Sequence, residues 1–203
     1  MKIAILVEGE TEKAFEGKLR DFLWTRLEEK QMPKLKLLPQ GGRIPTKDKL
    51  KRKVDILLSG KDAYQAVIAL TDVYTGTKDF KDAEDAKAKM RQWVGNNPDF
   101  YPHVALHDFE AWLLPYWKTI QELAKHNLSS PSSSPETVNH NNPPAHRIKD
   151  IFERGQCKKS YSKPIHGKKI LEKNDLNIAI QSCPELKAFI NTILSLSGGT
   201  ILD

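Results

Sequence analysis

The chain has few cysteines and no long apolar run. It holds 203 residues but only two cysteines, Cys157 and Cys183, which lack CxxC spacing and cannot form a metal cluster by themselves. Its apolar stretches stay well short of the roughly 18 residues that a membrane-spanning helix needs. The first apolar stretch meets an acid at Glu8, which is too early for a secretory signal. We therefore expect free thiols and a cytoplasmic protein that does not associate with a membrane.

Two common kinds of site are also missing from the sequence. The six histidines show no spacing typical of zinc ligands. A GxxxxGK[ST] phosphate loop is lacking, and the pairs Gly41-Gly42 and Gly198-Gly199 are too short to cradle phosphates. These absences argue against a zinc protein and against an intrinsic P-loop ATPase.

Basic residues are concentrated in two segments. The chain has 32 Lys and Arg against 26 Asp and Glu. Residues 34–53 hold eight basic residues against one acid, and residues 154–173 hold seven against one. This distribution favours a surface that faces a polyanion, although solvated lysine-rich faces are the alternative. The residues that we expect to bind nucleic acid are Lys47, Lys49, Lys51, Arg52, Lys53, Lys158 and Lys159.

Strand and helix patterns alternate through the first part of the chain. Aliphatic runs predict strands over 2–7, 34–38, 66–71 and 101–106, while helical spacing predicts helices over 15–27, 46–58, 82–94 and from residue 109 to 117. This alternation predicts an α/β fold, with a mostly parallel sheet of about four strands and helices on both faces. We expect an α/β core over 1–128, a polar linker or mobile loop over 129–144, and a helical C-terminal extension packed on the core over 145–203.

Acidic residues follow three of the predicted strands. The first strand ends at Glu8, within EGETE, the third ends at Asp72, and the fourth ends at His107-Asp108-Phe109-Glu110. Because ligands of parallel sheets bind beyond the carboxyl ends of the strands, these acids could converge if their strands are neighbours. Glu12 lies four residues after Glu8 and could share its helical face. Each acid also has a structural interpretation, such as capping a turn or pairing with a lysine.

Clustered carboxylates of this kind indicate a site for a hard divalent cation. Carboxylates that are buried together repel one another unless a cation neutralises them. Mg²⁺ prefers oxygen ligands and is usually held by one or two carboxylates together with substrate phosphates. Such a metal can activate water and stabilise a phosphate during displacement. The pattern therefore predicts Mg²⁺ or Mn²⁺ as cofactor.

The longer motifs resemble a known family. VEGETE, TDVYTGTKDF, LHDFEAWL and KPIHGKKI, followed by Cys183-Pro184, resemble the Toprim-like family of unknown function DUF4276, which is related to the Toprim domains of overcoming-lysogenization-defect (OLD) nucleases. The resemblance implies a Toprim-like fold and metal-dependent nuclease chemistry. It also implies an ABC- or SMC-like ATPase as partner, a possible homodimer, and a role as effector of a defence or repair system.

The resemblance also implies roles for individual residues. Glu8 matches the Toprim glutamate, as general base or metal ligand, and Asp72 matches the first acid of the Toprim Asp-x-Asp. The second acid position holds Tyr74, so Asp79, Asp108 or Glu110 would have to replace it, with Glu12 in the same metal shell. A basic residue should face the metal, and Lys168 is our first candidate and Lys163 our second.

Three functions are compatible with the sequence. The first is a metal-dependent nuclease acting on DNA or RNA. The second is a non-catalytic, Toprim-like scaffold that binds an ATPase or nucleic acid, since fold does not determine function. The third is a single-metal phosphotransferase or phosphohydrolase acting on a small nucleotide.

Overall fold

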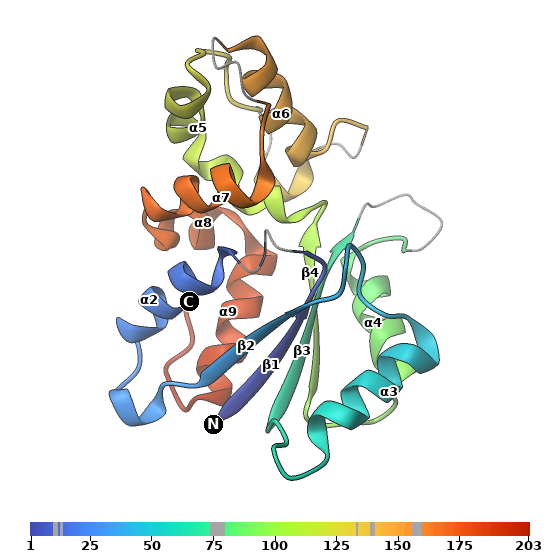
Figure 1. The fold of residues 1–203 in the computed structure, drawn as a ribbon. Helices are drawn as coiled ribbons and strands as arrows, with labels where there is room; N and C mark the ends of the chain where they lie inside the picture. The colour runs from blue at the N-terminus through green and yellow to red at the C-terminus, as the bar shows by residue number, and fades with distance from the viewer. Residues whose placement is uncertain (10–11, 13, 74–79, 133, 139–140, 156–159) are drawn as a thin grey trace.

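Four parallel strands form the sheet at the centre of this computed structural model (Figure 1). The structure describes residues 1–203 apart from 10–11, 13, 74–79, 133, 139–140 and 156–159. The strands are β1 (Lys2–Val7), β2 (Lys34–Pro39), β3 (Ala66–Val73) and β4 (Phe100–Leu106), in the order β2-β1-β3-β4. Aliphatic residues dominate the two central strands, β1 and β3, which are buried along nearly their whole length, as parallel strands covered on both faces require.

The strand order reverses between β1 and β3. From β1 the chain moves outward to β2, then returns past β1 to β3 and β4. The register places Ile3 opposite both Leu35 and Ala66, and Val67 opposite Phe100. The carboxyl ends of β1 and β3 are therefore neighbours at the topological switch point, where parallel sheets bind their ligands.

Helices cover both faces of the sheet (Figure 1). The helices are α2 (Glu16–Trp24), η1 (Glu29–Gln31), α3 (Lys47–Leu58), α4 (Ala83–Val94), η2 (Phe109–Tyr116), α5 (Trp117–Ala124), η3 (Pro135–Thr137), α6 (Pro144–Arg154), α7 (Lys163–Glu172), α8 (Leu176–Ser182) and α9 (Pro184–Leu196). One face of the sheet packs against α2 and α9, and the other packs against α3 and α4. Alternate residues of β1 serve the two cores, with Ile3 and Ile5 in one and Ala4 and Leu6 in the other, as the two-residue period of a strand dictates.

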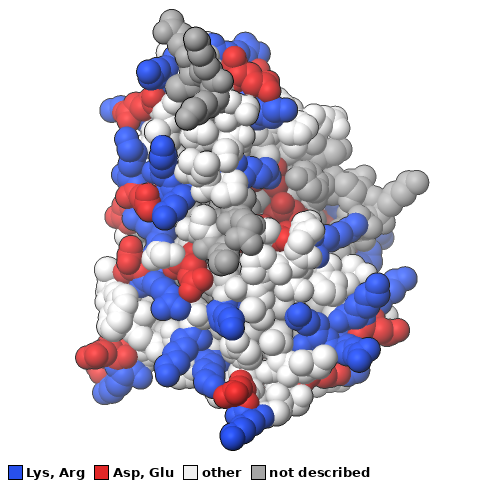
Figure 2. Space-filling model, viewed as in Figure 1, with Lys and Arg blue, Asp and Glu red and all other residues white. Residues whose placement is uncertain are grey.

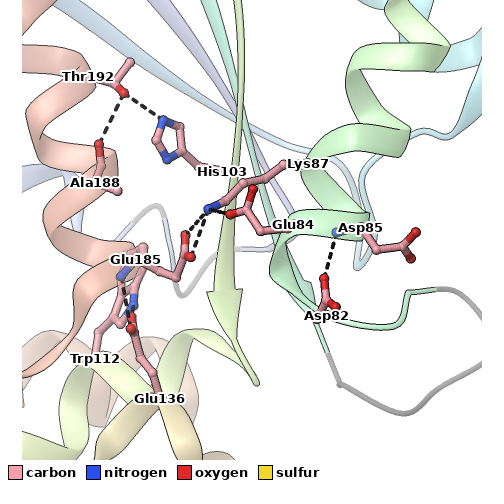
Figure 3. A network of polar contacts seen from close by, with 10 residues as sticks. All are labelled: Asp82, Glu84, Asp85, Lys87, His103, Trp112, Glu136, Glu185, Ala188 and Thr192. Atoms are coloured by element: carbon pink, nitrogen blue, oxygen red, sulfur yellow. Dashed lines mark hydrogen bonds and ion pairs between the residues drawn. The ribbon is translucent and has the colours of Figure 1, made fainter.

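The C-terminal helices complete the first of these cores. Leu186 and Phe189 of α9 belong to the same hydrophobic cluster as Ile5 of β1. Within the segment 129–144, which we expected to be a polar linker or mobile loop, Glu136 and Val138 are buried. Glu136 accepts hydrogen bonds from Trp112 Nε1 and from the backbone N–H of Glu185, both at 3.0 Å (Figure 3). It thereby joins this segment to η2 and to the first turn of α9.

The predicted α/β fold class is confirmed, with two local differences. Residues 109–116 form a 3-10 helix that contains Pro115, where we expected a regular helix. The short helix α8, with its polar residues Asn177 and Gln181, was not predicted. Within the described part of the chain, no helix is both long and apolar enough to cross a membrane.

Candidate functional site

Glu8 and Asp72 meet where β1 and β3 end. Glu8 follows the last residue of β1, and its Oε1 accepts hydrogen bonds from the hydroxyl of Thr71 and, at 3.1 Å, from the backbone N–H of Asp72. Asp72 Oδ1 in turn accepts a hydrogen bond from the backbone N–H of Phe109 at 3.1 Å. These contacts fix both carboxylates at the switch point and connect them to the segment that follows β4.

Asp108 and Glu110 occupy that segment and are fully buried. Asp108 Oδ2 accepts a hydrogen bond from the backbone N–H of Ala145 at 3.2 Å, and Glu110 Oε2 lies 3.0 Å from Lys163 Nζ. The other oxygen of each carboxylate, Asp108 Oδ1 and Glu110 Oε1, is buried without a hydrogen bond from any described residue. Buried polar atoms normally have partners, so these two oxygens are exceptions within the described part of the chain.

Glu12 is the fifth acid of the group. Its side chain is buried, and Oε2 accepts a hydrogen bond from the backbone N–H of Gly9 at 3.1 Å. This bond holds the turn between β1 and the first helix. We call Glu8, Glu12, Asp72, Asp108 and Glu110 the acid cluster.

Burial raises the pKa of Glu8, Glu12, Asp72 and Asp108, and neighbouring acids raise it further for the last three. Burial raises the pKa of Glu8, against the opposing effects of Thr71, the Asp72 backbone N–H, Arg43 and Lys163. Burial followed by the charge of Glu8 and of the other acids raises the pKa of Asp72 well above its usual range.

Burial and the charges of neighbouring acids also shift the pKa values of Asp108 and Lys163. Burial, followed by the charge of Glu110, raises the pKa of Asp108 to about 7. Burial of the Lys163 amine opposes its charge, but Glu110, Asp108 and Asp72 outweigh that effect and raise the pKa of the lysine. The site therefore carries an excess of negative charge that a cation would relieve.

The carboxylates of the acid cluster are the kind of ligand that a divalent cation prefers. Among the residues that the structure describes, no three Asp, Glu, His or Cys side chains form a ready-made metal cage. Mg²⁺ does not require one, because it commonly keeps several waters and binds one or two carboxylates plus substrate phosphates. The paired carboxylates of Glu8 and Asp72, together with the unpartnered oxygens of Asp108 and Glu110, match this chemistry.

Of the two lysines predicted to face the site, Lys163 does so and Lys168 does not. The Lys163 side chain is 46% exposed and reaches Glu110, which is 1% exposed. Lys168 instead lies 3.7 Å from Glu172 on the outside of α7. Both residues belong to α7, so the difference depends on which side of that helix faces the acid cluster.

Other predicted residues lie apart from the acid cluster or outside the described residues. Lys47, Lys49, Lys51 and Arg52 are exposed on α3, and Lys53 is half-buried there. Figure 2 shows Lys and Arg side chains gathered over this helix at the lower right, with a few acidic side chains between them. Asp79, Lys158 and Lys159, and also Tyr74 and Cys157, lie outside the described residues.

Sequence reasoning missed three residues of the site. Thr71 donates its hydroxyl to Glu8, and its place directly before Asp72 is the only sequence signal for this role. Arg43 lowers the pKa of Glu8 from the loop after β2. The Tyr161 hydroxyl is buried, and burial followed by Glu110 and Asp108 raises its pKa. Only the fold brings Arg43 and Tyr161 to the acid cluster.

Comparison with known proteins agrees with this architecture. A solved structure, the C-terminal region of the Burkholderia pseudomallei OLD protein, superposes with a TM-score of 0.56 at 10% sequence identity, covering 97% of this chain and 98% of that one. At that identity the likeness concerns the fold, which is Toprim-like. A search of well-characterised protein sequences finds no match. The family model described as "Domain of unknown function (DUF4276)" matches residues 7–194, and the chain therefore belongs to this family.

Proposed function

We propose that the chain is a divalent-metal-dependent nuclease that hydrolyses phosphodiester bonds of DNA or RNA at the acid cluster. The observation that supports this function best is the meeting of Glu8 and Asp72, both with raised pKa, at the switch point beside the buried acids Asp108 and Glu110. Buried carboxylates that repel one another are costly to the fold, and a bound dication removes that cost. A dication beside a phosphate-binding cation can supply the chemistry of a metal-dependent nuclease.

Each residue has a role in this proposal. Asp72 would be the primary ligand of Mg²⁺ or Mn²⁺, and Glu12, Asp108 and Glu110 would complete the metal shell. When bound, the metal supplies a polarised water and a counter-charge for the phosphate. Glu8, whose pKa is raised, is the general base that accepts the proton of the attacking water. Lys163, held by Glu110, contacts the scissile phosphate.

The alternative is a non-catalytic scaffold that binds nucleic acid or an ATPase. Two observations favour it: the described residues contain no three-ligand metal cage, and the basic residues of α3 are exposed away from the acid cluster. Under this hypothesis, charge reversals on α3 abolish binding while substitutions of the acids are tolerated. In either case we expect an ABC- or SMC-like ATPase as partner, as the family resemblance implies.

Metal binding distinguishes the two hypotheses. We expect Mn²⁺ to bind the unmutated protein in calorimetry and to raise its free energy of unfolding by about 2.7 kcal/mol at a metal concentration about 100-fold above Kd. Asp72→Asn should lose this gain. Without metal, the same variant should be at least as stable as the unmutated protein, because it removes one charge from the repelling group. Asp62→Asn is the matched control, since Asp62 is 96% exposed and precedes β3 at the opposite edge of the sheet.

Two results would contradict the nuclease. The first is equal Mn²⁺ binding by Asp72→Asn and the unmutated protein, and the second is no binding at millimolar Mn²⁺ even with an oligonucleotide present. Cleavage of labelled DNA and RNA provides the second readout. Glu8→Gln should slow Mn²⁺-dependent cleavage by about 100-fold or more, as expected for loss of a general base.

A further inference from the structure

A polar cavity lies between the start of α3 and the C-terminal half of α4, next to the loop that carries Arg43. Its volume is about 340 Å³. Three cations, Arg43, Lys47 and Lys89, line it together with the aromatic rings of Phe80 and Trp93. None of the described residues that line the cavity is acidic. The cavity therefore combines positive charge with an aromatic wall.

The two aromatic rings of the cavity, Phe80 and Trp93, are packed against each other. Phe80 is buried, and its ring centroid lies 6.2 Å from that of Trp93 at an interplanar angle of 43°. Lys89 Nζ lies 5.7 Å from the Phe80 centroid and also pairs with Asp85 at 2.7 Å. Trp93 packs against this core but is only partly buried. Part of its indole ring is therefore open to the cavity on a rigid support.

The cavity and the acid cluster share the loop between β2 and α3. Gly42 N–H donates a hydrogen bond to the Glu8 carbonyl oxygen at 2.7 Å, and Gly42 has a φ of +110°, which favours glycine. The next residue, Arg43, lines the cavity and lowers the pKa of the Glu8 side chain. Arg43 therefore belongs to the lining of the cavity and also acts electrostatically on the acid cluster.

Lys47 adds another cation to the lining of the cavity, at the start of α3. It is exposed at the start of α3, and the structure gives it no ion pair with any described residue. Lys51 of the same helix differs in this respect, since it pairs with Asp55 at 2.8 Å. Lys47 can therefore bind an anion without breaking an existing ion pair.

We propose that this cavity binds one nucleotide of a single nucleic-acid strand, with the base stacked on Trp93 and the phosphates contacted by Arg43 and Lys47. The inference rests on the proposed function for its substrate class and specifies that substrate as single-stranded beside the acid cluster. An aromatic platform with flanking cations is the arrangement that binds single strands irrespective of sequence. A base within a duplex is already stacked and paired, so it cannot use such a platform without being extruded.

The test measures binding in EDTA, so that it does not depend on metal or catalysis. The probe is a fluorescein-labelled oligothymidylate of about 12 nucleotides, a length within the range of single-strand binding sites, and binding is followed by anisotropy at several salt concentrations. Trp93→Leu should weaken binding about ten-fold or more through loss of one base stack. Trp24→Leu is its control, because Trp24 is 54% exposed at the end of α2. Trp93→Phe, which keeps a ring, should retain part of the affinity.

Lys47→Ala provides an independent arm that does not disturb the core. It should weaken binding and lower the slope of log K against log salt by about 0.7, the loss of one phosphate contact on a single strand. The control is Lys61→Ala, at an exposed lysine beyond the end of α3. It should leave the affinity and the salt slope unchanged. Binding of a duplex of the same length should not respond to Trp93→Leu.

Two outcomes would overturn the inference. One is unaltered oligothymidylate binding by both Trp93→Leu and Lys47→Ala, and the other is an equal loss of duplex and single-strand binding in Trp93→Leu. Thermal unfolding of each variant shows whether it is folded. If the strand-binding test contradicts the inference but Mn²⁺ still binds the acid cluster, the nuclease proposal is unaffected. If Mn²⁺ does not bind but the oligothymidylate binds as expected, the nuclease proposal alone is refuted.

Discussion

At the scale of single residues, His103 shows how burial, helped by nearby positive charges, sets a protonation state. It lies within β4 and is buried, and its Nε2–H donates to Thr192 Oγ1 at 2.9 Å, since that hydroxyl donates to the Ala188 carbonyl (Figure 3). Burial, followed by the charges of Lys87 and Arg91, lowers the pKa of His103 to about 4. The folded protein therefore keeps this imidazole neutral where the unfolded chain, with a pKa of about 6.5, is protonated.

This difference makes stability depend on pH. Between about pH 6.5 and 4 the unfolded state binds one more proton, so stability is lost as the pH falls. The unmutated protein should lose about 2 kcal/mol more than His103→Gln between pH 7 and 5, at about 1.4 kcal/mol per pH unit below 6.5. Urea unfolding at both pH values measures this, with His146→Gln, at an exposed histidine, as control. Parallel losses in the unmutated protein and His103→Gln would show that His103 does not titrate as described.

At the scale of elements, the strands were predictable and some helices were not. Predicted strands 2–7 and 66–71 correspond to β1 and β3. Short aliphatic runs between turn residues are typical of buried strands and are too short for a regular helix. Apolar spacing could not distinguish the 3-10 helix η2 from an α-helix, since η2 is buried on nearly all sides. The short helix α8 gave no clear periodicity, because seven residues make only about two turns.

The acids of the candidate site could be predicted from the strand ends, whereas the residues that depend on helix orientation and tertiary packing could not. Acids that follow parallel strands share one edge of the sheet, but the meeting of Glu8 with Asp72 also depends on β1 and β3 being neighbours, which the sequence left open. The choice of Lys163 over Lys168 depended on the orientation of α7, which its weakly amphipathic sequence does not fix. Trp93 of α4 and Arg43 of the loop after β2 line the same cavity, and this tertiary arrangement has no local sequence signal.

The start of α4 provides a test of how this helix is stabilised. Asp82 is its N-cap, and its Oδ1 accepts a hydrogen bond from the backbone N–H of Asp85 at 2.8 Å. Asp82→Ala should lower the free energy of unfolding by about 1 kcal/mol, as loss of a cap does. Thr46 is the matched control, because it occupies the N-cap of α3 but makes no side-chain cap hydrogen bond. Denaturant unfolding should show a smaller loss for Thr46→Ala, and equal losses would contradict the assigned cap.

At the scale of the whole molecule, one ion pair connects the helices on the two faces of the sheet. Lys87 of α4 lies 2.8 Å from Glu185 of α9 and 3.0 Å from Glu84 (Figure 3). The side chains of Lys87 and Glu185 are only 12% and 14% exposed. Together with β4, α4 and α9 line a cavity of about 670 Å³ beside the outer edge of the sheet. The pair thus connects the two helical layers across that edge, and Glu185 also donates its backbone N–H to Glu136.

Breaking this pair from one side should be more costly than removing it. Lys87→Met leaves Glu185 largely buried without its cation, so we expect the free energy of unfolding to fall by about 3 kcal/mol. Glu185→Met in the same chain should restore most of that loss, because two apolar side chains can replace a buried pair at little cost. Lys51→Met is the control, since Lys51 and Asp55 are about half exposed and should contribute less than about 1 kcal/mol. Urea unfolding of the single and double variants measures the coupling. If the double variant is no more stable than Lys87→Met, the pair is not what joins the two layers.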